Sequence, residues 1–197
     1  MKPDRAMVVG QELAPAQRVA VDLAAATAFA ALTAIGARVQ FHLPFTPVPV
    51  TGQVFCVLLA GAALGPRLGF VSMVEYLAAG AAGLPVFAYG GGPAALLGPT
   101  GGYLVAFPLA AALVGAVGRP GRTAVRPYTM LACLCGIAVI HVLGAGWYAV
   151  WSLAATGVAT LPAVLAQSVL PFVGVDVVKA GAAAAVAPGV RRKLSMS

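Results

Sequence analysis

Long apolar runs with very few charged residues inside them dominate this chain of 197 residues. Charged residues make up 9% of the sequence and hydrophobic residues 61%, whereas ordinary soluble domains carry about 25% charged residues. The mean hydropathy of +0.96 indicates the same environment. So much apolar surface is stable only in lipid, and the sequence therefore predicts a membrane protein.

Six of these runs predict transmembrane helices, so the expected fold class is all-α, a polytopic membrane protein with six transmembrane helices. Alanine and glycine dominate the runs, which is typical of helices whose backbones approach closely. Several runs are short for a bilayer about 30 Å thick, so flanking residues must extend them or neighbouring helices must bury their ends. The predicted spans cover residues 19–39, 52–64, 68–84, 101–117, 128–151 and 172–187.

Lysine and arginine lie almost entirely on one side of the predicted bilayer. Cytoplasmic loops carry an excess of these residues, so the expected topology has both termini in the cytoplasm. Only Arg38 then lies outside, and Lys179 lies within the membrane. The net charge of +7 is a signal of topology and of contact with membrane lipids, not of nucleic-acid binding. The cytoplasmic cations are Lys2, Arg5, Arg18, Arg67, Arg119, Arg122, Arg126, Arg191, Arg192 and Lys193.

The chain is expected to form one transmembrane domain between two short polar ends. Residues 1–18 are a cytoplasmic polar leader without an apolar core, residues 19–188 the six-helix domain, and residues 189–197 a basic cytoplasmic tail. The uncharged segment from Trp151 to Leu170 could be a seventh span, but a seventh crossing would put the basic tail outside. We expect instead a short helix and loop at the outer surface, with Pro171 in the first turn of the last span.

Two opposite charges, Asp176 and Lys179, stand three residues apart within the last apolar run. That spacing places both side chains on one face of a helix, roughly 8 Å and 12 Å below its outer start. Ionisable groups at membrane depth cost roughly 2.5 to 3.5 kcal/mol and usually have a polar task. The pair either neutralises itself and holds helices together, or it contacts a ligand that is polar at one end.

Two outer segments are rich in turn residues. In residues 44–53, prolines enforce an extended chain, Thr51 is the expected N-cap of the second span, and Gln53 lies in its first turn. Gln53 is either part of a stiff connector or a ligand contact. Residues 83–103 are uncharged and glycine-dense, and they carry Phe87, Tyr89 and Tyr103, whose rings offer apolar walls with polar tips.

Nucleotide and metal chemistry have no matching motif in the sequence. The glycines at 90–92 are not followed by Gly-Lys-Ser or Gly-Lys-Thr, so the chain lacks a phosphate-binding lysine loop. Cys56, Cys133 and Cys135 lie in apolar runs with a spacing that fits no metal site. No cofactor and no metal are therefore expected.

Four ordered motifs give the chain a resemblance to a known family. They are Pro47-Val-Pro-Val-Thr-Gly-Gln53, Gly83-Leu-Pro-Val-Phe-Ala88, Leu97-Gly-Pro-Thr-Gly-Gly-Tyr103, and Leu170-Pro-Phe followed by Asp176 and Lys179. From about residue 20 to residue 187 the sequence is similar to the BioY family, the biotin-specific substrate-binding (S) components of energy-coupling-factor transporters. The resemblance implies biotin capture from outside a bacterial inner membrane. It also implies a transmembrane coupling protein and two cytoplasmic ATPase subunits as partners, which alone would use ATP.

The resemblance also implies roles for individual residues. Asp176 would accept hydrogen bonds from the ureido group of biotin, and Lys179 would serve either the biotin carboxylate or Asp176 itself. The aromatic residues would enclose the ring system. The alanine face of the first span would dock the coupling protein. The expected binding residues are Asp176, Lys179, Gln53, Thr51, Phe87, Tyr89, Thr100 and Tyr103, and the docking residues are Ala24, Ala28, Ala30 and Ala34.

Two other functions are weaker interpretations. An intramembrane hydrolase would need Ser152 or Ser168 with His141, but neither serine has a Gly-x-Ser context. A small channel would need rings of like charge, which the sequence does not have. His141 is expected to be a hydrogen-bonded interior histidine, and Glu75 faces either the bundle interior or a partner. The chain is therefore expected not to be an enzyme.

Overall fold

The computed structural model describes residues 14–118 and 126–194. Within them the chain is helical apart from loops and one two-stranded antiparallel sheet, so the predicted all-α fold class is confirmed. The elements are α1 (Pro15–Arg38), β1 (Gln40–Phe41), β2 (Val50–Thr51), α2 (Gln53–Ala81), α3 (Pro93–Leu97), α4 (Gly101–Val117), α5 (Arg126–Thr156), α6 (Leu161–Ser168) and α7 (Leu170–Leu194).

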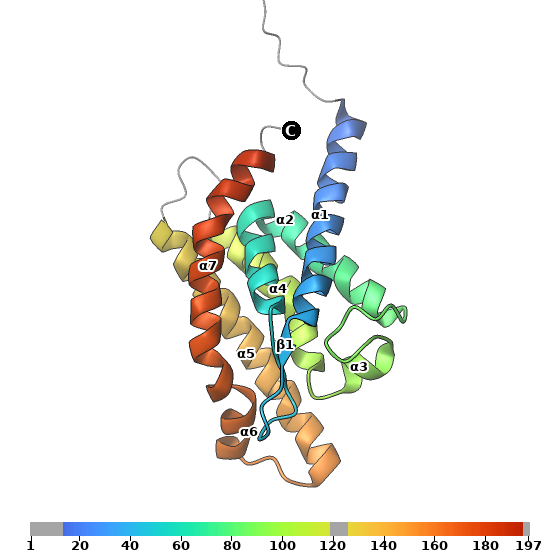
Figure 1. The fold of residues 1–197 in the computed structure, drawn as a ribbon, viewed down its shortest axis with the longest axis vertical. Helices are drawn as coiled ribbons and strands as arrows, with labels where there is room; N and C mark the ends of the chain where they lie inside the picture. Colours follow the sequence, from blue (N-terminus) through green and yellow to red (C-terminus); the bar gives the residue numbers. More distant parts are fainter. Residues whose placement is uncertain (1–13, 119–125, 195–197) are drawn as a thin grey trace, which may run out of the picture.

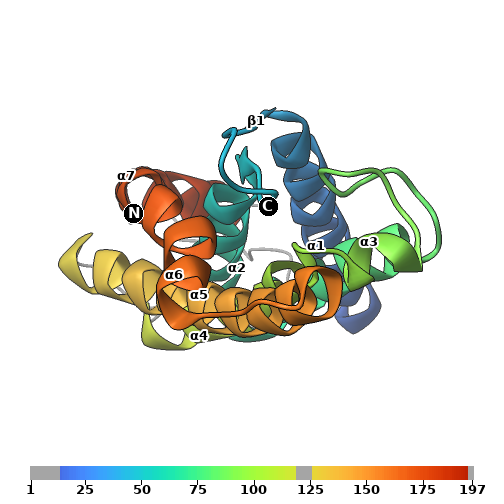
Figure 2. The same cartoon turned by 90° about the horizontal axis from the view of Figure 1, so that it is seen from below.

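Helix α2 is the centre of the bundle. It packs against α1, α4 and α7, and both views place it between α1 on one side and α7 on the other (Figures 1 and 2). Helices α4 and α5 pack against each other and close the bundle along a third side (Figure 2). The start of α1 and the end of α7 lie at the same end of the bundle (Figure 1).

A sharp break divides α2 at Gly65, whose φ of 83° lies in a region that glycine adopts without strain. Pro66 follows, and its ring and missing N–H prevent the helix from continuing straight. A Cβ on Gly69 would lie 3.0 Å from the Cα of Gly61, although residues eight apart in a straight helix are separated by about 12 Å. The two halves of α2 therefore fold back on each other.

The two halves of α2 correspond to the predicted spans 52–64 and 68–84. Among the described residues, four helices are long and apolar enough to cross a membrane. They are α1, α2, the part of α5 from Tyr128 to Thr156, and α7, and α4 is a shorter apolar helix. The span count of six and the cytoplasmic position of both termini remain predictions.

The segment between α5 and α7 contains the short helix that the sequence predicts. Helix α5 continues to Thr156, beyond the predicted end at residue 151, and α6 covers only eight residues. Helix α7 starts at Leu170, so Pro171 lies in its first turn, where its missing N–H breaks no helical hydrogen bond. An eight-residue helix is too short to cross a bilayer.

Candidate functional site

A cavity of about 560 Å³, including the part open to solvent, lies where the start of α2 meets α4, α5 and α7. Its walls are mostly apolar, and a few polar groups are gathered among them, as in sites for small organic molecules. The lining residues are Val48, Pro49, Val50, Thr51, Gln53, Val54, Ala88, Thr100, Tyr103, Leu104, Phe107, Ile140, His141, Phe172, Asp176 and Lys179.

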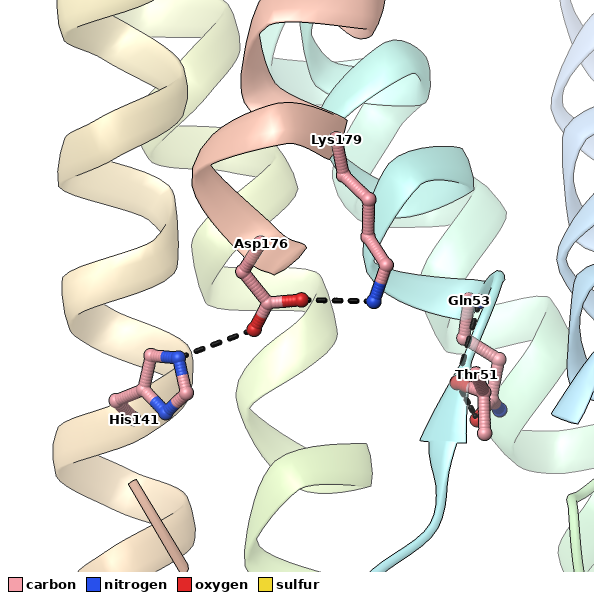
Figure 3. Close-up of polar contacts among 5 residues, drawn as sticks. All are labelled: Thr51, Gln53, His141, Asp176 and Lys179. Carbon is pink, nitrogen blue, oxygen red and sulfur yellow. Dashed lines mark hydrogen bonds and ion pairs between the residues drawn. The ribbon is translucent and has the colours of Figure 1, made fainter. Parts of the chain in front are cut away.

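The polar centre of the cavity is Asp176, which is only 3% exposed. Lys179 Nζ donates a hydrogen bond to Asp176 Oδ1 at 2.7 Å, and His141 Nε2 lies 3.1 Å from Asp176 Oδ2 (Figure 3). The pairing of Asp176 with Lys179 follows from their spacing on α7, which brings both to one face. Each oxygen of the carboxylate thus has its own partner, as a buried charge requires.

His141 is the member of this cluster that sequence reasoning did not assign to the site. It is buried and hydrogen-bonded, as expected for an interior histidine, but its partner is Asp176 and it lines the cavity. A histidine within an apolar run signals a polar partner nearby. The sequence does not identify that partner, because the register of α5 against α7 depends on the packing of the whole bundle.

Thr51 and Gln53 reach the cavity through the strand pairing before α2, in which Gln40 pairs with Thr51. The N-cap of α2 is Gly52 and not Thr51 as predicted, because Thr51 still belongs to β2. The Thr51 hydroxyl nevertheless accepts the backbone N–H of Gln53 at 3.3 Å and donates to Gln53 Oε1 at 3.0 Å. Gln53 Nε2 donates to the hydroxyl of Tyr76, so the amide is held on both sides.

Thr100 and Tyr103 enter the cavity from the start of α4. Thr100 is the N-cap residue of this helix. The Tyr103 hydroxyl donates to the backbone oxygen of Ser168 at the end of α6, and its ring meets His141 edge-on, with 6.4 Å between the ring centroids. Tyr103 therefore connects α4 to α6 and forms one wall beside the polar centre.

Phe87 and Tyr89, which we expected to enclose a ligand, are not among the residues that line the cavity. Phe87 is buried against Gly80, which has no side chain to block the ring, and it packs edge-on against Tyr76. Tyr89 is 48% exposed, and its hydroxyl donates to the backbone oxygen of Pro47 at 2.7 Å. Tyr89 thus joins two loops next to the cavity, whereas its neighbour Ala88 lines it.

The four alanines expected to form one docking face on α1 do not share one environment. Ala24 and Ala28 are exposed, Ala34 is half-buried, and Ala30 is 8% exposed and packs in the core. The two pairs have four-residue spacing but lie on different sides of the helix, since residues two apart point in different directions. Only Ala24 and Ala28 belong to an outward face.

The two serines of the alternative hydrolase interpretation do not form hydrogen bonds with His141. Ser152 Oγ donates to the backbone oxygen of Val158, and Ser168 Oγ to that of Val164. The histidine that would activate them is hydrogen-bonded to Asp176. The described geometry therefore does not favour a serine–histidine pair.

The match to a family model decides between a transporter subunit and the other interpretations. The model of the BioY family matches residues 9–196, which is nearly the whole chain. The chain belongs to the BioY family.

Two named relatives agree with this membership. The protein named probable biotin transporter BioY of Pyrococcus horikoshii is 43% identical over 160 residues, covering 81% of this chain and 89% of the relative. The biotin transporter BioY of Thermotoga maritima is 38% identical and covers 59% of this chain and 67% of the relative.

A solved structure described as the S-component for biotin from an ECF-type ABC transporter has the same fold. Its TM-score is 0.77 at 26% identity, and the match covers 94% of this chain and 96% of that one. The shared fold therefore extends over nearly the whole chain.

Proposed function

We propose that this chain is the membrane-embedded biotin-binding subunit of an energy-coupling-factor transporter. The observation that carries the proposal is the buried Asp176, paired with Lys179 and His141, at the polar centre of a mostly apolar cavity in a member of the BioY family. Biotin uptake is the function to which the family and its named relatives point.

The chemistry of biotin complements this cavity. Its ureido ring carries two N–H donors and one carbonyl, and a carboxylate such as Asp176 accepts such donors strongly. Its thioether ring and alkyl chain suit the apolar walls, which include Phe107, Ile140 and Phe172. Thr51, Gln53 and Thr100 are the further polar contacts that we propose for the ligand.

Lys179 has two proposed roles in the bound state. Its ammonium donates a hydrogen bond to Asp176 at 2.7 Å. It either keeps this partner or turns to the biotin carboxylate, which is a second anion brought in by the ligand. The two roles make different predictions for a ligand that has no carboxylate.

This sequence carries no Walker-type lysine loop, so transport driven by ATP would need partners that hydrolyse the nucleotide. We propose a transmembrane coupling protein and two cytoplasmic ATPase subunits, with the outward face of α1 at Ala24 and Ala28 as the docking surface. The proposed location is a bacterial inner membrane, with the cavity open toward the outer side.

Equilibrium binding of labelled biotin to the purified protein in detergent tests the proposal. The variant Asp176→Asn keeps the shape of the side chain but loses the charge, and we expect its affinity to fall about tenfold or more. Ser152→Ala, which changes a polar residue outside the cavity, is the matched control. Wild-type protein that is folded and does not bind biotin would refute the function, and an unchanged Asp176→Asn affinity would remove Asp176 from the site.

A further inference from the structure

Tyr76, in the second half of α2, contacts the walls of the cavity without lining it. It is 1% exposed and is not among the residues that line the cavity. Its ring stacks with that of Phe107, with 6.3 Å between the centroids, and meets the ring of Phe87 edge-on at 5.3 Å. Its hydroxyl accepts a hydrogen bond from Gln53 Nε2 and donates one to the backbone oxygen of Val86 at 3.1 Å. Of these neighbours, Phe107 and Gln53 line the cavity.

The contact between Gln53 and Tyr76 exists because α2 is broken at Gly65. The two residues are 23 positions apart, and in a straight helix about 34 Å would separate them. They stand at nearly equal distances along the chain from Gly65, so the fold-back brings them together. A cavity residue at the start of α2 is thus held by a buried residue of the other half of the same helix.

The hydroxyl of Tyr76 determines the direction of the Gln53 amide. A phenol has a single hydrogen, and Tyr76 directs it to the backbone oxygen of Val86, which can only accept. Toward Gln53 the hydroxyl can therefore only accept, so the amide nitrogen must face it. The amide oxygen then faces Thr51, whose hydroxyl donates to it at 3.0 Å (Figure 3). The amide has one direction before any ligand arrives.

The fixed amide keeps hydrogen-bonding capacity for a ligand. Its oxygen has a second lone pair and its nitrogen a second hydrogen, and among the described residues no other group uses either. A side chain that is already held in its bound direction does not have to be ordered by the ligand, whereas a free side chain does. Affinity should therefore be higher with the amide fixed than with the amide free.

We infer that Tyr76 is a positioning residue of the biotin site and that it raises affinity by fixing the amide of Gln53. The inference rests on the proposed function, in which Gln53 contacts the ligand. Tyr76 itself does not touch biotin. The affinity for biotin thus depends on a residue outside the cavity and on the fold-back of α2 that brings it to Gln53.

A double-mutant cycle tests this inference. Tyr76→Phe keeps the ring and removes only the hydroxyl, and we expect it to weaken biotin binding about two- to tenfold, the cost of ordering one side chain. Gln53→Met replaces the amide by an unbranched apolar chain and should weaken binding by removing the ligand contact. In Gln53→Met protein, adding Tyr76→Phe should have no further effect, because no amide remains to be fixed. The four dissociation constants come from titration with labelled biotin in detergent.

Two other tyrosines provide the controls. Tyr148 is also buried, and its hydroxyl donates to Gln167 Oε1 at 2.7 Å, but neither residue lines the cavity. Tyr148→Phe should therefore bind biotin like wild type. The Tyr89 hydroxyl holds the loop that contains Val86 by another hydrogen bond, so Tyr89→Phe should weaken binding by the same factor with Gln or Met at position 53. Thermal unfolding without ligand checks that each variant is folded.

Each outcome has one meaning. Wild-type affinity in Tyr76→Phe would overturn the inference, and so would wild-type affinity in Gln53→Met, which would leave Tyr76 no ligand contact to position. An equal loss from Tyr76→Phe with Gln or Met at position 53 would also overturn it, because Tyr76 would then act through packing or through the loop at Val86. Failure of folded wild-type protein to bind biotin would instead refute the proposed function.

Discussion

Arg191 Nε, near the end of α7, donates a hydrogen bond to the backbone oxygen of Ala62 in the first half of α2. In an unbroken helix this oxygen would accept the N–H of residue 66, but Pro66 has no N–H. The guanidinium replaces the missing donor and places positive charge at the C-terminal end of the half-helix, where the helix dipole favours it. A side chain of α7, the last helix, thus supplies the hydrogen bond that the first half of α2 loses at the break.

Arg191→Ala should therefore destabilise the protein. The substitution leaves a backbone oxygen without its donor, at a cost of about 1 to 3 kcal/mol. Thermal unfolding in detergent should show a lower midpoint, and Arg191→Lys should recover part of the loss because the ammonium remains a donor. Arg67→Ala removes the same charge from an exposed residue of α2. An equal fall in both alanine variants would mean that the charge, and not the hydrogen bond, is what matters.

Lys179→Ala distinguishes the two roles of this lysine. If Lys179 binds the biotin carboxylate, the variant should lose affinity for biotin but much less for biotin amide, which has no charge at that end. Binding of both ligands is measured on the same preparation. Equal losses for the two ligands would show that Lys179 acts through Asp176.

Bulky substitution on α1 separates ligand capture from transport. Ala28 is exposed, so Ala28→Trp should leave biotin binding intact and abolish uptake by the complete transporter, because closely packed transmembrane helices do not accommodate a large side chain. Ala30 is in the core, so Ala30→Trp should reduce folding and binding together. Binding and uptake are measured on each variant. Normal uptake by Ala28→Trp would place docking on another surface.

Cysteine labelling in intact cells checks the topology. In a variant without the three native cysteines, a single cysteine at the exposed Thr160 should react with an impermeant thiol reagent from outside. A cysteine at Thr123, which lies outside the described residues, should react only after permeabilisation. Labelling at position 123 in sealed cells would show that the orientation is the opposite of the predicted one and that the cavity opens on the inner side.

Tyr89→Phe tests whether the two loops beside the cavity control ligand release. The Tyr89 hydroxyl donates to Pro47, and partial burial raises the pKa of Tyr89, so the donor stays protonated at neutral pH. Loss of one hydrogen bond should speed biotin dissociation about three- to tenfold, with little change in association rate. Dissociation is followed by chase with unlabelled biotin. Tyr128→Phe, at an exposed tyrosine outside the cavity, is the control.

Local signals in the sequence identified the features that depend on neighbouring residues. The Asp176–Lys179 pair was predictable because three residues on one helix set its geometry. The break of residues 52–84 into two helical halves was also predictable, since it falls at Gly65 and Pro66, residues that end helices.

Features that depend on contacts between distant segments were not predictable in this way. The partner of His141 is on another helix. Phe87 is buried away from the cavity because Gly80, which has no side chain, leaves space for its ring. The alanine spacing on α1 could not separate Ala28 from Ala30, because only the positions of α2 and its neighbours determine which side of α1 is covered. Side-chain type was visible in the sequence, but the direction of each side chain was not.

The polar groups of the cavity come from α2, α4, α5 and α7, so they are assembled only in the folded chain. A ligand that needs all of them binds the native state alone and stabilises it by about 2.7 kcal/mol at a hundredfold excess over its dissociation constant. The lifetime of the protein in the cell therefore depends on the supply of biotin. Cells starved of biotin would hold a less stable pool of this protein, which quality-control proteases remove faster.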